Sequence, residues 1–397
     1  MKIVAIISEY NPMHLGHIYQ INYIKKQIPQ AKIISLGSGS FVQRGEPSFI
    51  SKHSKAKIAV DNGVDLFLEM PSIISIQSAN LFAFHSVKLL NKLNIVTDLS
   101  FGVEDLSKED LVSQAKFEID NKEYINTRNT EFMKQGLSYK KAYAKSLISL
   151  GQKAQMKPNN TLALAYTKAI LSMNSDINIM PILRKNSHYH DKSLIDGEFQ
   201  SASSLRKLWH SNHSDIIKYL AFNPYDYDQS IDQVRFDDLT ELFYYKAFIQ
   251  NTSADLTPGY EKGLLDYLKS KYTSSLSDMI NKAHNNRYSK SRLRRFVINY
   301  LLDIQLEDIK RLDGINYVRP LAFNDQGASI LKLIKERSSL SILTHLAKDD
   351  VLNQASKEVL NIDKRAFKLY NIKDISKNSL DFTHVPYIKK PPKDIES

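Results

Sequence analysis

Short apolar runs alternate with amphipathic segments through the first two hundred residues. The runs "KIVAIIS" (2–8), "AKIISLGS" (31–38), "DLFLEMP" (65–71), "VTDLSFG" (96–102) and "INIMPILR" (177–184) each end at turn or polar residues, which predicts buried strands. Residues 15–28, 54–63 and 78–94 lie between these runs and predict helices. Because strands that alternate with helices form parallel sheets with right-handed crossovers, we predict an α/β fold with a parallel sheet.

The alternation of predicted strands and helices ends near residue 225. The segments "FDDLTELFYYKAFIQ", "GYEKGLLDYLKSKY" and "SLSDMINKAHNN" predict helices, and few strand signals separate them. A chain of 397 residues is also too long for one ordinary core. We therefore predict two domains, an α/β domain over residues 1–215 and a mainly helical domain over residues 225–397.

Composition narrows the class of protein. Hydrophobic residues make up 42% and charged residues 24% of the chain, which is typical of a soluble globular protein. The sequence predicts no membrane span and no signal peptide, and a cytoplasmic location is expected. The chain has no cysteine, so disulfides, thiolate zinc sites and a cysteine nucleophile are excluded. The net charge of +11 either simply aids solubility or indicates a polyanionic partner, most commonly nucleic acid. Charge alone does not distinguish these two interpretations.

The stretch "ISEYNPMHLGHIYQ" (7–20) stands where the first predicted strand passes into the first predicted helix. In an open parallel sheet this turn is the usual phosphate site, because free N–H groups and the helix dipole attract an anion. His14 and His17 are three residues apart and lie on one face of a helical turn, and Gly16 allows a close approach. Two imidazoles there could donate hydrogen bonds to phosphate oxygens, so we predict that both are catalytic. A metal pair or two surface histidines are the alternatives.

Two motifs carry a resemblance to a known superfamily. "NPMHLGH" resembles the His-x-Gly-His signature of the nucleotidyltransferases, which bind ATP across this turn and have a Rossmann-like domain. "SASSLRK" (201–207) is similar to their second signature, a Ser/Thr-rich stretch that ends in arginine. This resemblance makes Ser203, Ser204 and Arg206 candidate contacts to the ATP phosphates.

A wider set of segments resembles one family, the tRNA(Met) cytidine acetate ligases. The segments are "ISEYNPMHLGH", "GSFVQRGEPSFISK", "GVDLFLEMP", "QSANLFAFHSVKLL", "LSFGVED", "KPNNTLALAY", "RKNSHYHD" and "SASSLRK", in this order. The resemblance implies a ligase that activates acetate with ATP as acetyl-adenylate. It further implies transfer of the acetyl group to N4 of the wobble cytidine of elongator tRNA(Met).

The family's ATP site is implied at two sets of positions. The first is the opening stretch, with Ile7, Ser8, Glu9, Tyr10, Asn11, Pro12, Met13, His14, Leu15, Gly16, His17, Ile18, Tyr19 and Gln20. The second is Gly102, Asn159 or Asn160, and Arg184. Mg²⁺ is expected on the ATP phosphates, and we predict no metal ion held by the protein alone.

The chemistry of the second set agrees with the resemblance. Gly102 comes directly after "TDLSF" in the fourth predicted strand and could lie flat against a nucleotide, although an ordinary turn glycine is the alternative. Asn159 and Asn160 open a predicted helix, so one of them could be its N-cap instead. Arg184 ends the fifth predicted strand, where a guanidinium could pair with phosphate, or could be simply solvated.

The segment "NNRYSKSRLRRFVINYLLDI" is the best candidate for a nucleic-acid contact. Basic side chains gather at and before the start of a predicted helix with an apolar stripe; they are Arg287, Lys290, Arg292, Arg294 and Arg295. With Tyr288 they suit phosphate contacts and base stacking in RNA. The alternative is a solvated basic face on an ordinary core helix.

Two rival functions remain open from the sequence. An adenylyltransferase that moves AMP onto a small phosphorylated metabolite would keep the same histidines. It would need no helical RNA-binding domain. The other rival is a tRNA-binding protein that senses ATP without turning it over. The sequence leaves open the choice of tRNA, the acetate-binding residues and the oligomeric state.

Overall fold

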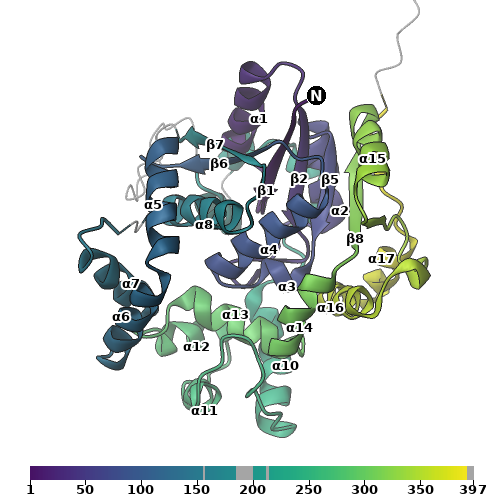
Figure 1. The fold of residues 1–397 in the computed structure, drawn as a ribbon. Helices are drawn as coiled ribbons and strands as arrows, with labels where there is room; N and C mark the ends of the chain where they lie inside the picture. Colours follow the sequence, from purple (N-terminus) through teal and green to yellow (C-terminus); the bar gives the residue numbers. More distant parts are fainter. Residues whose placement is uncertain (155–156, 185–199, 212–213, 391–397) are drawn as a thin grey trace, which may run out of the picture.

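The computed structural model describes residues 1–154, 157–184, 200–211 and 214–390, and its centre is a mostly parallel sheet (Figure 1). Its strand order is β10-β8-β5-β2-β1-β6-β7, and β9 pairs with β8. The strands are β1 (Ile3–Ser8), β2 (Lys32–Ser38), β5 (Leu66–Met70), β6 (Asp98–Val103), β7 (Asn178–Leu183), β8 (Tyr317–Phe323), β9 (Ser341–Ile342) and β10 (Tyr387–Ile388). The five strands predicted from the first two hundred residues are therefore confirmed.

The predicted parallel arrangement holds for these five strands. β1 pairs in parallel with β2 and β6, β2 pairs in parallel with β5, and β6 pairs in parallel with β7. The register sets Ser8 beside Gly37 and Gly102 beside Ile182. The carboxyl ends of the central strands therefore meet at one edge of the sheet, where α/β proteins bind their ligands.

Helices cover both faces of this sheet because side chains alternate along each strand. Val4 and Ile6 face one core with α1 (Leu15–Gln27) and α2 (Lys52–Asp61). Ile3 and Ala5 face the other core with α4 (Ala79–Lys92) and α8 (Pro158–Ser172). The architecture is a three-layer α/β fold with helices on both sides (Figure 1).

Two smaller features connect the strands of this half. A short hairpin of β3 (Phe41–Val42) and β4 (Glu46–Pro47) follows β2, and α3 (Ser72–Ser75) follows β5. After β6 the chain forms α5 (Lys108–Asp120), α6 (Lys122–Lys134) and α7 (Tyr139–Ile148) before α8. Every helix in the described ranges is too short or too polar to cross a membrane.

The second half begins with helices, as predicted. They are α10 (Thr240–Tyr244), α11 (Leu264–Ser270), α12 (Leu276–Ala283), α13 (Lys290–Leu301) and α14 (Leu306–Arg311), and α9 (Ala202–His210) precedes them within residues 1–215. After them come α15 (Asp325–Arg337), α16 (Gln354–Tyr370) and α17 (Leu380–Thr383), between and beside the last three strands.

The prediction for residues 225–397 missed the strands of this half. β8 lies in the main sheet and pairs antiparallel with β5, and β9 and β10 pair with β8. The run "YVRPLAF" did not read as a buried strand because Arg319 and Pro320 interrupt its apolar pattern. Arg319 is nevertheless buried, because Glu69 and Asp381 each accept a hydrogen bond of 2.8 Å from it. That residues 1–215 and 225–397 are separate domains remains a prediction.

Candidate active site

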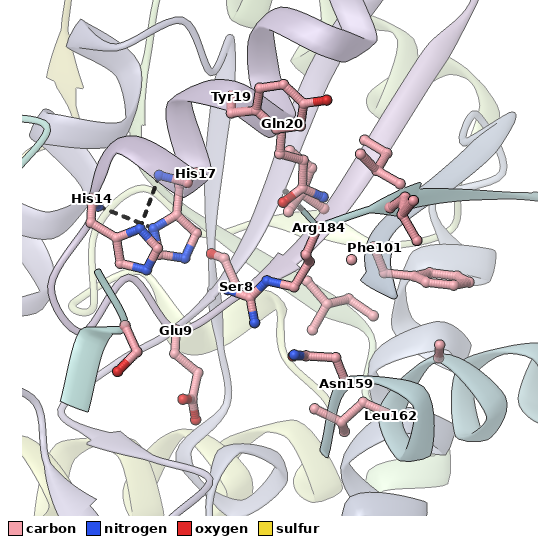
Figure 2. A pocket seen from close by; sticks show the side chains of 18 of the residues that line it. Ser8, Glu9, His14, His17, Tyr19, Gln20, Phe101, Asn159, Leu162 and Arg184 are labelled. Carbon is pink, nitrogen blue, oxygen red and sulfur yellow. Dashed lines mark hydrogen bonds between the residues drawn. The ribbon is translucent and has the colours of Figure 1, made fainter. Parts of the chain in front are cut away.

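A cavity of about 220 Å³ opens at the carboxyl ends of β1, β6 and β7. The starts of α1 and α8 and the segment before α9 complete its walls. Figure 2 shows the side chains that point into it. The lining residues are Ile6, Ile7, Ser8, Glu9, His14, Gly16, His17, Tyr19, Gln20, Phe101, Gly102, Asn159, Leu162, Ala163, Tyr166, Ile182, Leu183, Arg184, Gln200 and Ser201.

The start of α1 fixes the two histidines side by side. His14 is the N-cap of α1, and its Nδ1 accepts a hydrogen bond of 3.1 Å from the Gly16 N–H. The Nδ1 of His17 accepts a hydrogen bond of 3.1 Å from the His14 backbone N–H, drawn as a dashed line in Figure 2. The two rings are 3.9 Å apart between centroids. Since both Nδ1 atoms are acceptors, a neutral imidazole must carry its proton on Nε2 at each position.

The imidazoles are also kept neutral. Burial, with a smaller contribution from Arg184, lowers the pKa of His14 from 6.5 to about 4. Burial, His14 and Arg184 together hold the pKa of His17 well below its usual value. The site therefore presents two Nε2–H donors without an imidazolium charge at neutral pH.

The second predicted set gathers on the other side of the cavity. Gly102 on β6, Asn159 on α8 and Arg184 after β7 all line it, and Figure 2 shows Arg184 reaching between Ser8 and Asn159. A Cβ on Gly102 would lie 3.3 Å from Cγ of Arg184. The glycine therefore leaves room for the arginine to cross the end of β6.

The two asparagines have different surroundings. Asn159 lines the cavity, whereas Asn160 is fully buried. The Asn160 Oδ1 accepts from the Glu104 N–H at 2.9 Å, and its Nδ2 donates to Asp105 at 2.5 Å. Neither asparagine is the N-cap of α8, which is Lys157. The Glu104 carboxylate accepts the backbone N–H groups of both asparagines instead, at 3.1 and 2.8 Å.

The residues of the opening stretch (7–20) also differ in whether they line the cavity. Ile7, Ser8, Glu9, His14, Gly16, His17, Tyr19 and Gln20 line the cavity, while Tyr10, Asn11, Pro12, Met13, Leu15 and Ile18 do not. Tyr10 and Met13 are core side chains. Asn11 is buried as well, and its Oδ1 accepts from the Phe49 N–H at 2.6 Å. Tyr10, Asn11 and Met13 therefore support the turn from within the protein core.

The serine-rich motif starts α9 but does not reach the cavity with all its residues. Ser201 caps the helix and lines the cavity, whereas Ser203, Ser204 and Arg206 are absent from the lining. Arg206 instead donates hydrogen bonds to the Asn11 carbonyl at 2.6 Å and to the Glu46 carboxylate at 3.1 Å. The arginine therefore joins the histidine turn to the β3–β4 hairpin.

The basic cluster of α13 is also divided. Arg287 and Lys290 are exposed, and Glu261 pairs with both Arg287 at 2.8 Å and Arg292 at 2.5 Å. Arg294 pairs with Glu46, and Arg295 donates to the Gln43 carbonyl at 3.1 Å. The last two arginines therefore face the β3–β4 hairpin.

Sequence reasoning missed the apolar wall of the cavity, formed by Phe101, Leu162, Ala163, Tyr166, Ile182 and Leu183, and the polar residues Gln200 and Ser201. Phe101 stands next to Gly102, and Leu162, Ala163 and Tyr166 follow Asn159 at helical spacing, so the neighbouring motif residues were a usable signal. The remaining residues of "RKNSHYHD" after Arg184 lie outside the described residues.

Comparison with known proteins places the chain in a family. Residues 1–382 match the family HIGH Nucleotidyl Transferase. The tRNA(Met) cytidine acetate ligase of Clostridium kluyveri is 34% identical over 98% of this chain and 99% of its own length. The ligase of the same name from Clostridium novyi is 32% identical over 98% of this chain and 100% of its own length.

Solved structures agree with these matches. The crystal structure of Thermotoga maritima TmcAL bound with alpha-thio ATP has a TM-score of 0.86 and 25% identity, over 98% of this chain and 100% of that one. The apo form of the same protein has a TM-score of 0.88, with the same identity and coverage. With matches in sequence and in fold along almost its whole length, the chain belongs to the tRNA(Met) cytidine acetate ligase family of HIGH nucleotidyltransferases.

Proposed function

We propose that this protein joins acetate to the AMP moiety of ATP and passes the acetyl group to N4 of the wobble cytidine of elongator tRNA(Met). The observation that carries the proposal is the pair of neutral Nε2–H donors at the carboxyl end of β1. The full-length relatives that bear the ligase name support the same reaction.

ATP occupies the cavity in this proposal. The phosphates lie over the start of α1, within reach of His14, His17 and Arg184, because N–H donors and a cation converge there. The adenine packs against the apolar wall of Phe101, Leu162 and Tyr166. Asn159 contacts the nucleotide, while Asn160, Ser203, Ser204 and Arg206 support the site from outside it.

The reaction proceeds in two steps. A carboxylate oxygen of acetate attacks the α-phosphorus, which breaks the bond to pyrophosphate and forms acetyl-adenylate. The cytidine N4 then attacks the acyl carbon, AMP leaves, and the amine loses its proton. His14 and His17 stabilise the charge that develops on the α-phosphate oxygens in the first step. Positioning and electrostatics suffice, so the protein needs no nucleophile.

Mg²⁺ is expected to enter with the ATP phosphates. Among the described residues, no group of three or more histidine, aspartate or glutamate side chains could hold a metal ion. Mg²⁺ is commonly bound by one or two carboxylates together with substrate phosphates, and Glu9 in the cavity wall fits that role.

The tRNA would contact Arg287 and Lys290, the exposed basic residues just before and at the start of α13. Arg292 beside them is only 22% exposed and pairs with Glu261. We assign Arg294 and Arg295 to the contact between α13 and the β3–β4 hairpin instead, because Glu46 and Gln43 engage their guanidinium groups.

Purified protein incubated with ATP, labelled acetate and bulk tRNA tests the proposal. Label in tRNA that depends on ATP, with release of AMP and pyrophosphate, is the expected result. If no label enters tRNA, and the purified protein instead forms an adenylated product when ATP and small phosphorylated metabolites are supplied, the adenylyltransferase would be favoured. Binding of tRNA and ATP without turnover would favour the sensor.

A further inference from the structure

The helical hairpin of α6 and α7 is the most basic surface element that the proposed function leaves unused. Its 27 residues, from Lys122 to Ile148, contain six lysine or arginine residues and two glutamates. It therefore carries +4 of the chain's net charge of +11 in a small fraction of its length.

The lysines of the hairpin are exposed, and the Nζ of one of them, Lys145, also lies over the Phe132 ring, 4.5 Å from its centroid. Ile125 and Phe132 on α6 and Leu147 on α7 are buried. The side chains of the five lysines Lys122, Lys134, Lys140, Lys141 and Lys145 are exposed. Arg128 is less exposed and pairs with Glu131 at 2.7 Å, which leaves Glu123 as the other acidic group of the hairpin.

The hairpin adjoins the basic end of α13. The Lys141 Nζ donates to the Asn286 Oδ1 at 3.3 Å, directly before Arg287 in the chain. Figure 1 shows α6 and α7 projecting from the body beside α12, which leads into α13. The segment that follows α7 leads to Pro158 and Asn159, at the wall of the cavity. Basic segments from both halves of the chain therefore meet where Lys141 contacts Asn286, next to Arg287.

We propose that the α6–α7 hairpin binds the phosphate backbone of the tRNA, so that the α/β half holds the substrate together with α13. This inference rests on the proposed function. The composition favours RNA over an acidic protein, because lysine is depleted in protein–protein interfaces and abundant in contacts to phosphates. The spread of lysines over two exposed helix faces also suits a long polyanion better than a single small anion.

The test removes three exposed lysines of the hairpin together, in the variant K134Q/K140Q/K145Q. The matched control, K332Q/K335Q/K368Q, removes the same charge from exposed positions on α15 and α16, which lie on the opposite side of the molecule in Figure 1. A third variant, K134R/K140R/K145R, keeps the charge. Affinity for bulk tRNA is measured across a salt series, and acetate-dependent ATP–pyrophosphate exchange is measured without tRNA.

We expect the glutamine variant of the hairpin to bind tRNA at least about tenfold more weakly at low salt than the control does. Its slope of log affinity against log salt should be shallower by about two, because each lost phosphate contact removes roughly 0.7 to 0.9 from the slope. The arginine variant should bind tRNA as tightly as the parent protein does. The rate of ATP–pyrophosphate exchange should be unchanged in all three variants.

Equal affinity and slope in the hairpin variant and the control would overturn the inference, and so would a loss of binding in the arginine variant. Loss of ATP–pyrophosphate exchange in the glutamine variant of the α6–α7 hairpin would show that these lysines support the fold instead. A parent protein that places no label in tRNA would overturn the proposed function. A parent that labels tRNA normally, with a hairpin variant that matches the control, would overturn only this inference.

Discussion

Backbone hydrogen bonds decide which atoms of the two active-site histidines are available for chemistry. The Gly16 and His14 N–H groups occupy both Nδ1 atoms, so the Nε2–H groups remain for a substrate. The rings lie 3.9 Å apart, so both donors can serve one phosphate. Such preorganised donors stabilise developing charge without reorganisation during the reaction.

Removal of one of these donors should affect the chemical step most strongly. We expect His17→Ala to reduce acetate-dependent ATP–pyrophosphate exchange by at least about 100-fold, as loss of one preorganised donor typically does. His345→Ala, outside the cavity, is the control and should keep full activity. Circular dichroism should show that both variants are folded. Full exchange activity in His17→Ala would contradict the assigned role.

The lowered pKa of His14 predicts a loss of stability in mild acid. As pH falls from 7.5 to 5, the unfolded chain binds a proton at this position near pH 6.5, while the folded protein resists protonation until about pH 4. His14 alone should therefore reduce the free energy of unfolding by about 2 kcal/mol over this range. His14→Asn keeps an N-cap but does not titrate, so its decline, measured by urea unfolding, should be smaller by about that amount. An equal decline in the two proteins would refute the prediction.

At the scale of elements, the β3–β4 hairpin joins the active-site turn to the helical half. Glu46 accepts hydrogen bonds from Arg206 on α9 and Arg294 on α13. The Gln43 N–H donates to Glu9 in the cavity wall at 2.6 Å. Gly45 has a φ of +73°, and a Cβ there would lie 2.4 Å from the Arg295 backbone nitrogen, so the turn packs directly on α13.

A double-mutant cycle between Glu46 and Arg294 measures this connection. We expect Glu46→Ala and Arg294→Ala to be non-additive by about 1 kcal/mol or more in the free energy of unfolding, because the two groups are in contact and mostly shielded from solvent. The exposed pair Glu307–Lys310 is the control and should couple by only a few tenths of a kcal/mol. We also expect Arg294→Ala to lower the rate of ATP–pyrophosphate exchange, because the β3–β4 hairpin holds Glu9 in the cavity wall through the Gln43 N–H. Additive effects would mean that Glu46 and Arg294 do not stabilise each other.

At the scale of the whole molecule, a buried ionic cluster fastens the C-terminal segment to the sheet. Lys52 on α2 contacts Glu69 at 2.8 Å and Asp381 at 2.9 Å, and Arg319 contacts both carboxylates at 2.8 Å. All four side chains are at most 4% exposed. Burial alone would raise the pKa of Asp381, but Lys52, His53 and Arg319 outweigh burial and hold it well below its usual value. Two cations and two anions therefore balance in the interior.

Removal of one charge should destabilise the whole fold. We expect Asp381→Asn to reduce the free energy of unfolding by about 3 to 5 kcal/mol, because it leaves a buried cation without its partner. The exposed Asp374, earlier in the same segment, is the control, and Asp374→Asn should change stability by no more than about 0.5 kcal/mol. Urea unfolding measures both variants. A similar small effect of the two substitutions would show that the cluster adds little to stability.

The sequence alone determined the α/β core and the carboxyl-edge part of the site. The pattern of hydrophobic residues over a short segment indicates whether that segment is buried, so the five strands could be predicted from the sequence. His14 and His17 are three residues apart at the start of one helix, Gly102 and Arg184 stand at the ends of strands, and Asn159 stands at the start of another helix. In a parallel sheet those positions meet without any knowledge of side-chain pairing.

Only the tertiary structure decided how residues distant in sequence pair. Arg206 and Arg294 both bind Glu46, which precedes them by 160 and 248 positions, so two motif arginines support the site from outside the cavity. Arg319 and Pro320 concealed a sheet strand, because a buried arginine is stable only with carboxylates from β5 and α17. Local pattern carries no information about such partners, since the free energy of a buried charge depends on what the complete fold brings within hydrogen-bond distance.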